Sequence, residues 1–286
     1  MLHVTSTETT QADKITLSVE APLDRLRNRI TGGRPWIRTH ELARIAVQML
    51  SGTLFRLRLK RGPVFLAYHP DSHAVFRQHP EFSGLFQSFT AANALNNGGD
   101  MMRLWSFTLN LKQVLSENVP GDFAELGVWR GNTASVLAHY AATNGRKMFL
   151  FDTFTGFDAA DLKGIDASKT KRFANTSLEM VKETLGQNVN VCEFVQGYFP
   201  EAVTQQAREA SYAVVSLDCD LYEPTKAGLA FFYERMPTGG LFLLHDYSSM
   251  FWNGPRAAID EFCAQSGERL ILMPDKSGSA FFRKSK

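Results

Sequence analysis

Short apolar segments alternate with segments of helical periodicity from Asp100 to the end of the chain, and this alternation constrains the fold most strongly. The apolar segments predict strands at 123–128, 148–152, 191–195, 213–217, 241–244, 270–273 and 280–282. Predicted helices cover 101–117, 133–143, 178–185, 225–235 and 255–266. Apolar strands that alternate with helices are typical of a parallel sheet covered on both faces, so we predict an α/β fold.

The last two predicted strands have no helix between them. Residues 274–278, which include Pro274 and Gly278, connect them over a length typical of a β-hairpin. A mostly parallel sheet that ends in a C-terminal antiparallel hairpin indicates the Rossmann-like sheet of class I methyltransferases rather than a dinucleotide-binding domain. We therefore expect a methyltransferase domain over 100–286, preceded by an N-terminal extension over 1–99.

The N-terminal extension has mixed signals: helical periodicity predicts a helix over 40–50, and alternating residues predict a strand over 54–59. Its basic residues accumulate between Arg25 and Arg61, where Glu41 is the only acid. No nucleic-acid motif accompanies them, so a solvated face or a contact with a partner subunit explains these charges more simply than nucleic acid does. We expect the extension to serve oligomerisation or to act as a lid, and the protein to be a homo-oligomer.

Composition and segment patterns exclude several classes of protein. The chain has 286 residues, 44% of them hydrophobic, and a formal net charge of +2, which permits a sizeable core but gives no general attraction for nucleic acid or acidic membranes. Neither a secretory signal nor a run of ~20 apolar residues is present. Cys192, Cys219 and Cys263 are too widely spaced to indicate disulfides or a zinc site. We expect a soluble, cytoplasmic protein that binds neither nucleic acid nor membrane.

The segment after the first predicted strand has the features of a cofactor-binding turn, since ligands of parallel sheets bind at the carboxyl ends of the strands. Gly127 permits a tight turn, and Gly131 lets the next helix begin near a ligand. Two glycines at this spacing do not form the GxGxxG pattern of dinucleotide sites, so S-adenosylmethionine, which has no phosphate, fits better. The predicted cofactor residues in this segment are Glu125, Gly127, Val128, Trp129, Gly131 and Thr133.

The next two strand ends supply further candidate cofactor residues. Asp152 can accept hydrogen bonds from both ribose hydroxyls, and Gln196 and Gly197 are placed to line an adenine pocket. A lone acid at a strand end caps a helix at least as often as it binds a ligand, but suitable features at three successive strand ends support one another. The long polar segment 153–175 is either a lid or a segment without function.

Acidic residues follow the fourth and fifth predicted strands and should meet at one rim of the sheet. Carboxylates on fixed strand ends suit a divalent ion such as magnesium, which would lower the pKa of a substrate hydroxyl. Alternatively, His245 acts as a general base or packs against Asp218, and the acids cap helices or pair with arginines. We predict Asp218 and His245 as catalytic residues, Asp218 also as a cofactor contact, and Asp218, His245 and Asp246 as metal ligands.

These motifs resemble those of the macrocin O-methyltransferase family, which methylates sugar hydroxyls of macrolide antibiotics. The resemblance covers roughly residue 100 to the C-terminus, and it lies in PGDFAELGVWRG (120–131), DTFTGF (152–157), QGYFP (196–200), LDCDLYEPT (217–225) and the segment 239–247. It implies a magnesium-assisted O-methyltransferase in which Asp218 and Asp246 bind the metal. His245 stands where the family usually has a second Asp, and a nitrogen donor suits manganese, iron or zinc better than magnesium.

The sequence therefore predicts an enzyme that transfers a methyl group from S-adenosylmethionine to a hydroxyl of a small molecule, a sugar or a natural product. Either a divalent metal or His245 would activate the hydroxyl. A nucleotide-binding oxidoreductase of related fold is disfavoured by the glycine spacing. A non-catalytic protein that uses the same fold for interaction is disfavoured by the joint presence of Glu125, Asp152, Asp218 and Asp246.

Overall fold

The computed structural model describes residues 81–91, 93, 97, 100–170 and 172–286. The chain divides into compact units at residues 1–68 and 69–286, and every described residue belongs to the second unit. The helix expected over 40–50, the strand expected over 54–59 and the basic segment 25–61 lie outside the described residues. The division at Asp100 and the role of the extension remain predictions.

The sheet has seven strands in the order β3-β2-β1-β4-β5-β7-β6, and its strands are β1 (Asp122–Leu126), β2 (Met148–Asp152), β3 (Cys192–Gln196), β4 (Tyr212–Leu217), β5 (Leu241–Leu244), β6 (Ile271–Leu272) and β7 (Ala280–Arg283). The first five are parallel, whereas β7 pairs antiparallel with both β5 and β6. The predicted mostly parallel sheet with a C-terminal antiparallel hairpin is confirmed.

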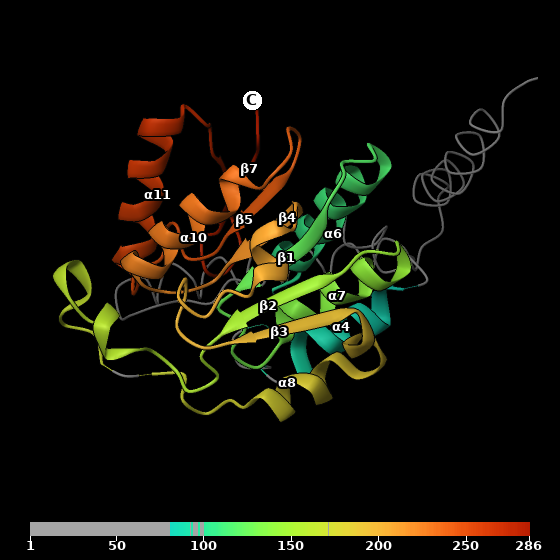
Figure 1. The fold of residues 1–286 in the computed structure, drawn as a ribbon, viewed down its shortest axis with the longest axis horizontal. Coiled ribbons are helices and arrows are strands. Elements are labelled where there is room, and N and C mark those ends of the chain that lie inside the picture. The colour runs from blue at the N-terminus through green and yellow to red at the C-terminus, as the bar shows by residue number, and fades with distance from the viewer. Residues whose placement is uncertain (1–80, 92, 94–96, 98–99, 171) are drawn as a thin grey trace, which may run out of the picture. The chain divides into compact units, whose positions relative to one another are not determined.

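Helices cover both faces of the sheet (Figure 1). They are α4 (Phe82–Ala91), α6 (Met101–Ser116), α7 (Asn132–Thr143), α8 (Leu178–Leu185), α9 (Gln205–Glu209), α10 (Tyr222–Glu234) and α11 (Asn253–Ser266). One face packs against α6, α7 and α8, with α4 against α7, and the other packs against α9, α10 and α11. None of the helices in this part of the chain combines the length and the apolar character that crossing a bilayer requires.

Successive side chains along each strand point to opposite faces of the sheet, so the position of a residue in its strand determines the face on which it lies. Along β1, Phe123 packs on the α6 side and Ala124 on the α10 side, and along β4 the same holds for Val214 and Val215. Glu125 therefore lies on the α6 side of the sheet. The register pairs it with Ser216, so two polar residues interrupt the apolar strands side by side.

Strand order reverses between β1 and β4. The chain runs outward from β1 through β2 to β3, then returns to place β4 on the other side of β1. The connections that leave β1 and β4 consequently diverge, and this opens a crevice at the carboxyl ends of these strands.

The polar segment between β2 and α8 is fixed to the rest of the domain at several points. Its two 3₁₀ turns are η1 (Ala159–Asp161) and η2 (Gly164–Asp166). Asp161 accepts a hydrogen bond of 2.6 Å from the Tyr198 hydroxyl, and the fully buried Asp166 accepts one of 2.7 Å from the Tyr222 backbone N–H at the start of α10. Nearer α8, the hydroxyl of Thr176 donates to the Trp129 carbonyl. These anchors position the segment beside the crevice.

Candidate active site

A cavity of about 610 Å³ opens at the carboxyl ends of β1, β2, β4 and β5. Most of the predicted site residues line it, namely Glu125, Gly127, Val128, Trp129, Thr133, Asp152, Gly197, Asp218, His245 and Asp246. The candidate cofactor residues and the candidate metal ligands therefore share one cavity.

Two predicted cofactor residues lie just outside the lining. Gly131 has a φ of 82° at the start of α7, and a Cβ there would lie 3.1 Å from the Val181 side chain, so its small size lets α7 and α8 approach each other. Gln196 ends β3 as an exposed residue, whereas its neighbours Gly197 and Tyr198 line the cavity. The cofactor roles of Gly131 and Gln196 remain predictions.

The turn after β1 approaches the end of β4 very closely. At Gly127 the φ angle is 86°, and a Cβ at this position would lie 2.1 Å from the backbone oxygen of Asp218. Only glycine fits both the left-handed backbone and this approach. The contact brings the turn of the candidate cofactor site next to the first acid of the candidate metal site.

Asp152 holds the cofactor turn in shape. Its Oδ2 accepts hydrogen bonds from the backbone N–H groups of Val128 (2.7 Å) and Trp129 (2.9 Å), and its Oδ1 accepts one from Phe154 (2.7 Å). Trp129 and Phe154 have left-handed φ angles of 47° and 53°, which non-glycine residues adopt at a cost. A carboxylate has about four acceptor sites, and the three backbone hydrogen bonds leave one of them, on Oδ1, for a ligand hydroxyl.

Glu125 is a buried carboxyl group that faces the cavity with one oxygen unsatisfied. The side chain is 1% exposed, and its Oε1 accepts a hydrogen bond of 3.1 Å from the Ser216 hydroxyl. Among the described residues its Oε2 has no hydrogen-bond partner. Burial, reinforced by the nearby charge of Asp218, raises the pKa of Glu125 well above its usual value. A ligand that donates a hydrogen bond or carries positive charge would satisfy this oxygen.

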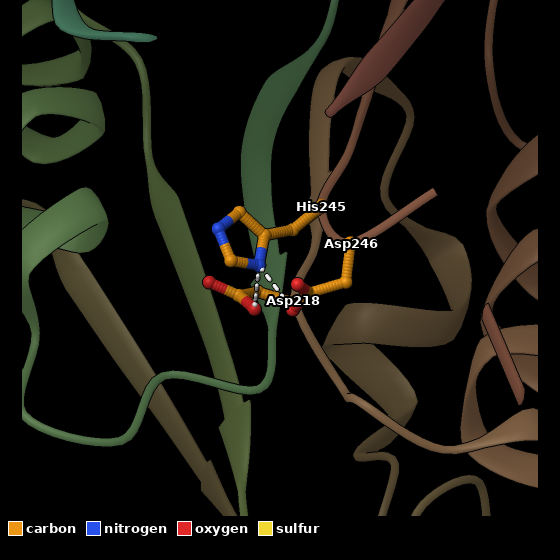
Figure 2. A group of neighbouring side chains, drawn as sticks. All are labelled: Asp218, His245 and Asp246. Carbon is orange, nitrogen blue, oxygen red and sulfur yellow. Dashed lines mark hydrogen bonds and ion pairs between the residues drawn. The ribbon is translucent and has the colours of Figure 1, made fainter. Parts of the chain in front are cut away.

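Asp218, His245 and Asp246 gather where β4 and β5 end. The register pairs Leu217 with Leu244, so the next residues, Asp218 and His245, are lateral neighbours. Nδ1 of His245 lies 2.7 Å from Oδ1 of Asp218 and 2.7 Å from Oδ2 of Asp246, and Figure 2 shows the ring nitrogen directed at both carboxylates. One ligand atom from each of the three residues lies within 4.8 Å of the others.

This donor set fits a divalent ion and departs from what magnesium prefers. Two carboxylate oxygens and one imidazole nitrogen lie within 4.8 Å of one another, and the nitrogen suits manganese, iron or zinc better than magnesium. Burial alone would lower the pKa of His245, but the charges of Asp218 and Asp246 outweigh it and raise that pKa well above its usual value. A proton therefore competes with a metal for the ring, which makes metal binding depend on pH.

Arg103 is a site residue that sequence reasoning missed. It lies on α6, is 4% exposed, and directs Nη1 at Nε2 of His245. Its Nη2 donates to Oδ1 of Asn97 at 2.5 Å, and its guanidinium lies 4.9 Å from the centre of the Phe89 ring. No sequence signal distinguished Arg103, because the helix that carries it has the same amphipathic pattern as any helix that packs on a sheet.

Asp220 is a second residue without an assigned role in the sequence analysis. It lines the cavity with a left-handed φ of 60°, two residues beyond Asp218. Burial and the charges of Asp218 and Asp246 raise the pKa of Asp220 well above its usual value.

The strand order of the sheet and the position of the cavity at the carboxyl ends of the strands define the fold as that of the class I methyltransferases. The solved structure of the O-methyltransferase NovP superposes with a TM-score of 0.59 at 20% identity, over 76% of this chain and 100% of that one. A calicheamicin methyltransferase, CalS11, superposes with a TM-score of 0.52 at 22% identity, over 77% of this chain and 99% of that one. These likenesses concern the fold alone.

The sequence then places the chain within one family. Residues 94–284 match the macrocin O-methyltransferase (TylF) family, and the chain belongs to it. A relative from Streptomyces olivaceus, 8-demethyl-8-(2,3-dimethoxy-alpha-L-rhamnosyl)-tetracenomycin-C 4'-O-methyltransferase, is 29% identical over 160 residues, which are 52% of this chain and 61% of the relative. The demethyldecarbamoylnovobiocin O-methyltransferase of Streptomyces niveus is 26% identical over 175 residues, 57% of this chain and 66% of that protein. The chain thus spans just under two thirds of these relatives' lengths.

Proposed function

We propose that this protein is an S-adenosylmethionine-dependent O-methyltransferase that methylates a hydroxyl of a small molecule, a sugar or a natural product. One observation carries the proposal: the glycine turn with Glu125 and Asp152 lines the same cavity as Asp218, His245 and Asp246. Family membership and the names of the relatives agree with it. The alternative of an oxidoreductase gains no support from the cavity, since the turn after β1 lacks the third glycine of dinucleotide sites.

In this proposal the ends of β1 and β2 hold the cofactor. Asp152 accepts a hydrogen bond from one ribose hydroxyl at Oδ1, fewer than the two expected from the sequence, because its other acceptor sites keep the turn in place. Glu125 receives the positively charged methionine end at its unsatisfied oxygen. Gly127 and Gly197 let the ligand approach the backbone closely, and Thr133 also lines the cavity.

The ends of β4 and β5 prepare the acceptor. Asp218, His245 and Asp246 would hold a divalent ion, which when bound lowers the pKa of the acceptor hydroxyl. In the alternative that needs no ion, His245 accepts the hydroxyl proton, which requires a neutral ring and therefore, because the pKa of His245 is raised, moves this route to higher pH. In either case the oxygen displaces S-adenosylhomocysteine from the methyl group, and the proton leaves to His245 or to solvent. Positioning the two reactants in line supplies much of the rate.

Binding of S-adenosylhomocysteine tests the cofactor half of the proposal. Titration calorimetry should show one site per chain, and Asp152→Asn should weaken it about 10- to 100-fold, since hydrogen bonds to charged groups contribute ~1.5–3 kcal/mol. Asp158→Asn is the matched control, because Asp158 is an exposed carboxylate that lines the same cavity. Undetectable binding to the unmodified protein would refute the proposed function, and equal affinity in both variants would refute the role of Asp152.

Replacing His245 by Asp should change the choice of metal. The affinity ratio of Mn²⁺ to Mg²⁺ should fall at least about tenfold, because an oxygen replaces the nitrogen donor. Electron paramagnetic resonance of bound Mn²⁺, with Mg²⁺ as competitor, measures this ratio without any need for turnover. Asp158→Asn should leave the ratio unchanged. If the ratio is also unchanged in His245→Asp, the imidazole is not a ligand and His245 is left as the candidate base.

A further inference from the structure

Asn132 is a buried polar residue at the cavity, and the proposed function gives it no role. It is the first residue of α7, it is 5% exposed, and it lines the same cavity as Glu125. Within the described part of the chain its Oδ1 has no hydrogen-bond partner, and neither has Oε2 of Glu125. A buried polar atom without a partner is costly, so two such oxygens at one cavity indicate a ligand that donates hydrogen bonds.

The amide of Asn132 is oriented by its contact with α4. Its Nδ2 donates a hydrogen bond of 3.1 Å to the Phe89 carbonyl. A carbonyl can only accept, so the amide nitrogen must face Phe89 and Oδ1 must face away from it. Phe89 precedes residues 94–284, which match the family, so a part of the chain outside the match fixes this orientation.

The two unsatisfied oxygens select one kind of ligand group. An amide oxygen and a carboxylate oxygen both accept hydrogen bonds, so a group that satisfies both must donate at least two. The sulfonium of S-adenosylmethionine has neither N–H nor O–H and cannot donate. The α-ammonium of its methionine end has three N–H donors, and its positive charge also offsets the burial of the Glu125 carboxylate. The pair of oxygens therefore matches the ammonium and not the sulfonium.

We propose that Asn132 is a cofactor-binding residue, and that its Oδ1 accepts a hydrogen bond from the α-ammonium while Oε2 of Glu125 accepts a second. This inference rests on the proposed function and goes further by assigning the ammonium to acceptors from β1 and α7. S-adenosylmethionine and S-adenosylhomocysteine both carry this ammonium, so Asn132 binds cofactor and product alike. Loss of the contact should raise the KM for the cofactor and leave kcat unchanged, because the contact does not strengthen in the transition state.

Two ligands that differ only in the amino group test the proposal. S-adenosylhomocysteine and its deamino analogue, which has a hydrogen in place of the amino group, are each titrated into the protein by calorimetry. The unmodified protein should prefer S-adenosylhomocysteine at least about 100-fold, since two hydrogen bonds to a charged group are at stake. Asn132→Leu, which has a similar shape but no acceptor, should lower this preference at least about tenfold.

Asn97→Leu is the matched control. Nδ2 of Asn97 donates a hydrogen bond of 2.9 Å to the same Phe89 carbonyl, but its Oδ1 already accepts from Arg103. Its loss should therefore leave the preference between the two ligands unchanged. Asn132→Asp serves as a second variant in case Asn132→Leu does not fold. It keeps an oxygen acceptor and adds a negative charge, so it should keep or increase the preference.

The outcomes separate this inference from the proposed function. If S-adenosylhomocysteine does not bind to the unmodified protein, the proposed function itself is refuted. If it binds, the role of Asn132 is overturned by equal affinities for the two ligands, or by a preference that Asn132→Leu leaves unchanged or that both leucine variants lower equally. A preference lost in Asn132→Asp overturns it as well. A preference that falls in Asn132→Leu and persists in Asn97→Leu and Asn132→Asp supports it.

Discussion

A Gly127→Ala variant is expected to lose at least about 3 kcal/mol of unfolding free energy and to bind S-adenosylhomocysteine more than about 100-fold more weakly. A Cβ at this position would lie 2.1 Å from the Asp218 backbone oxygen and 2.7 Å from the attached carbonyl carbon. Both atoms belong to the backbone, so the steric clash can be relieved only if β1 and β4 separate at the point where the cavity forms. Urea unfolding and titration calorimetry measure the two effects.

Gly145→Ala separates the steric effect from the cost of the backbone angle. Gly145 also has a left-handed φ, 64°, but a Cβ there would meet nothing within 4 Å. This control should lose only about 1 kcal/mol and keep its cofactor affinity. If the two variants are equally stable, the close approach of the turn to β4 is not what glycine provides at position 127.

The sheet could be predicted from the sequence because its strands are short, apolar and separated by clear helical periods. Each predicted strand overlaps an observed one, and the helix predicted over 101–117 is α6, Met101–Ser116. Two described helices, α4 and α9, were not predicted. The five residues of α9 are too few to show a period, and α4 lies in the region of mixed signals before the first strand.

The candidate site could be predicted only where it depends on strand ends. Asp218 and His245 meet because β4 and β5 are neighbours in register, and the carboxyl ends of parallel strands share one edge. The approach of Arg103 depends instead on which face of α6 packs over β5, and a single sequence does not specify such packing. For the same reason the contact of Phe157 and Phe173 with Trp252 was not foreseen, since the two rings reach it only through the anchored segment between β2 and α8.

Asp218→Asn should abolish methyl transfer, with kcat lowered at least about 10³-fold, while the affinity for S-adenosylhomocysteine changes less than about threefold. Asp218 supplies one of the three converging ligand atoms and one of the two carboxylates that contact Nδ1 of His245. An amide at position 218 binds a divalent ion more weakly than a carboxylate does. It also no longer stabilises the positive charge of the protonated imidazole of His245. Both routes to hydroxyl activation, the ion and the base, lose the same group.

Measuring this requires an acceptor that the unmodified protein methylates, with release of S-adenosylhomocysteine as the readout. Asp158→Asn provides the control, since it removes a carboxylate from the same cavity without touching the cluster. A chelator then distinguishes activation by the ion from activation by His245. If the unmodified protein keeps its activity in the chelator and Asp218→Asn has none, the hydroxyl proton is assigned to His245. Full activity of Asp218→Asn, with or without the chelator, would show that the reactive end of the cavity lies elsewhere.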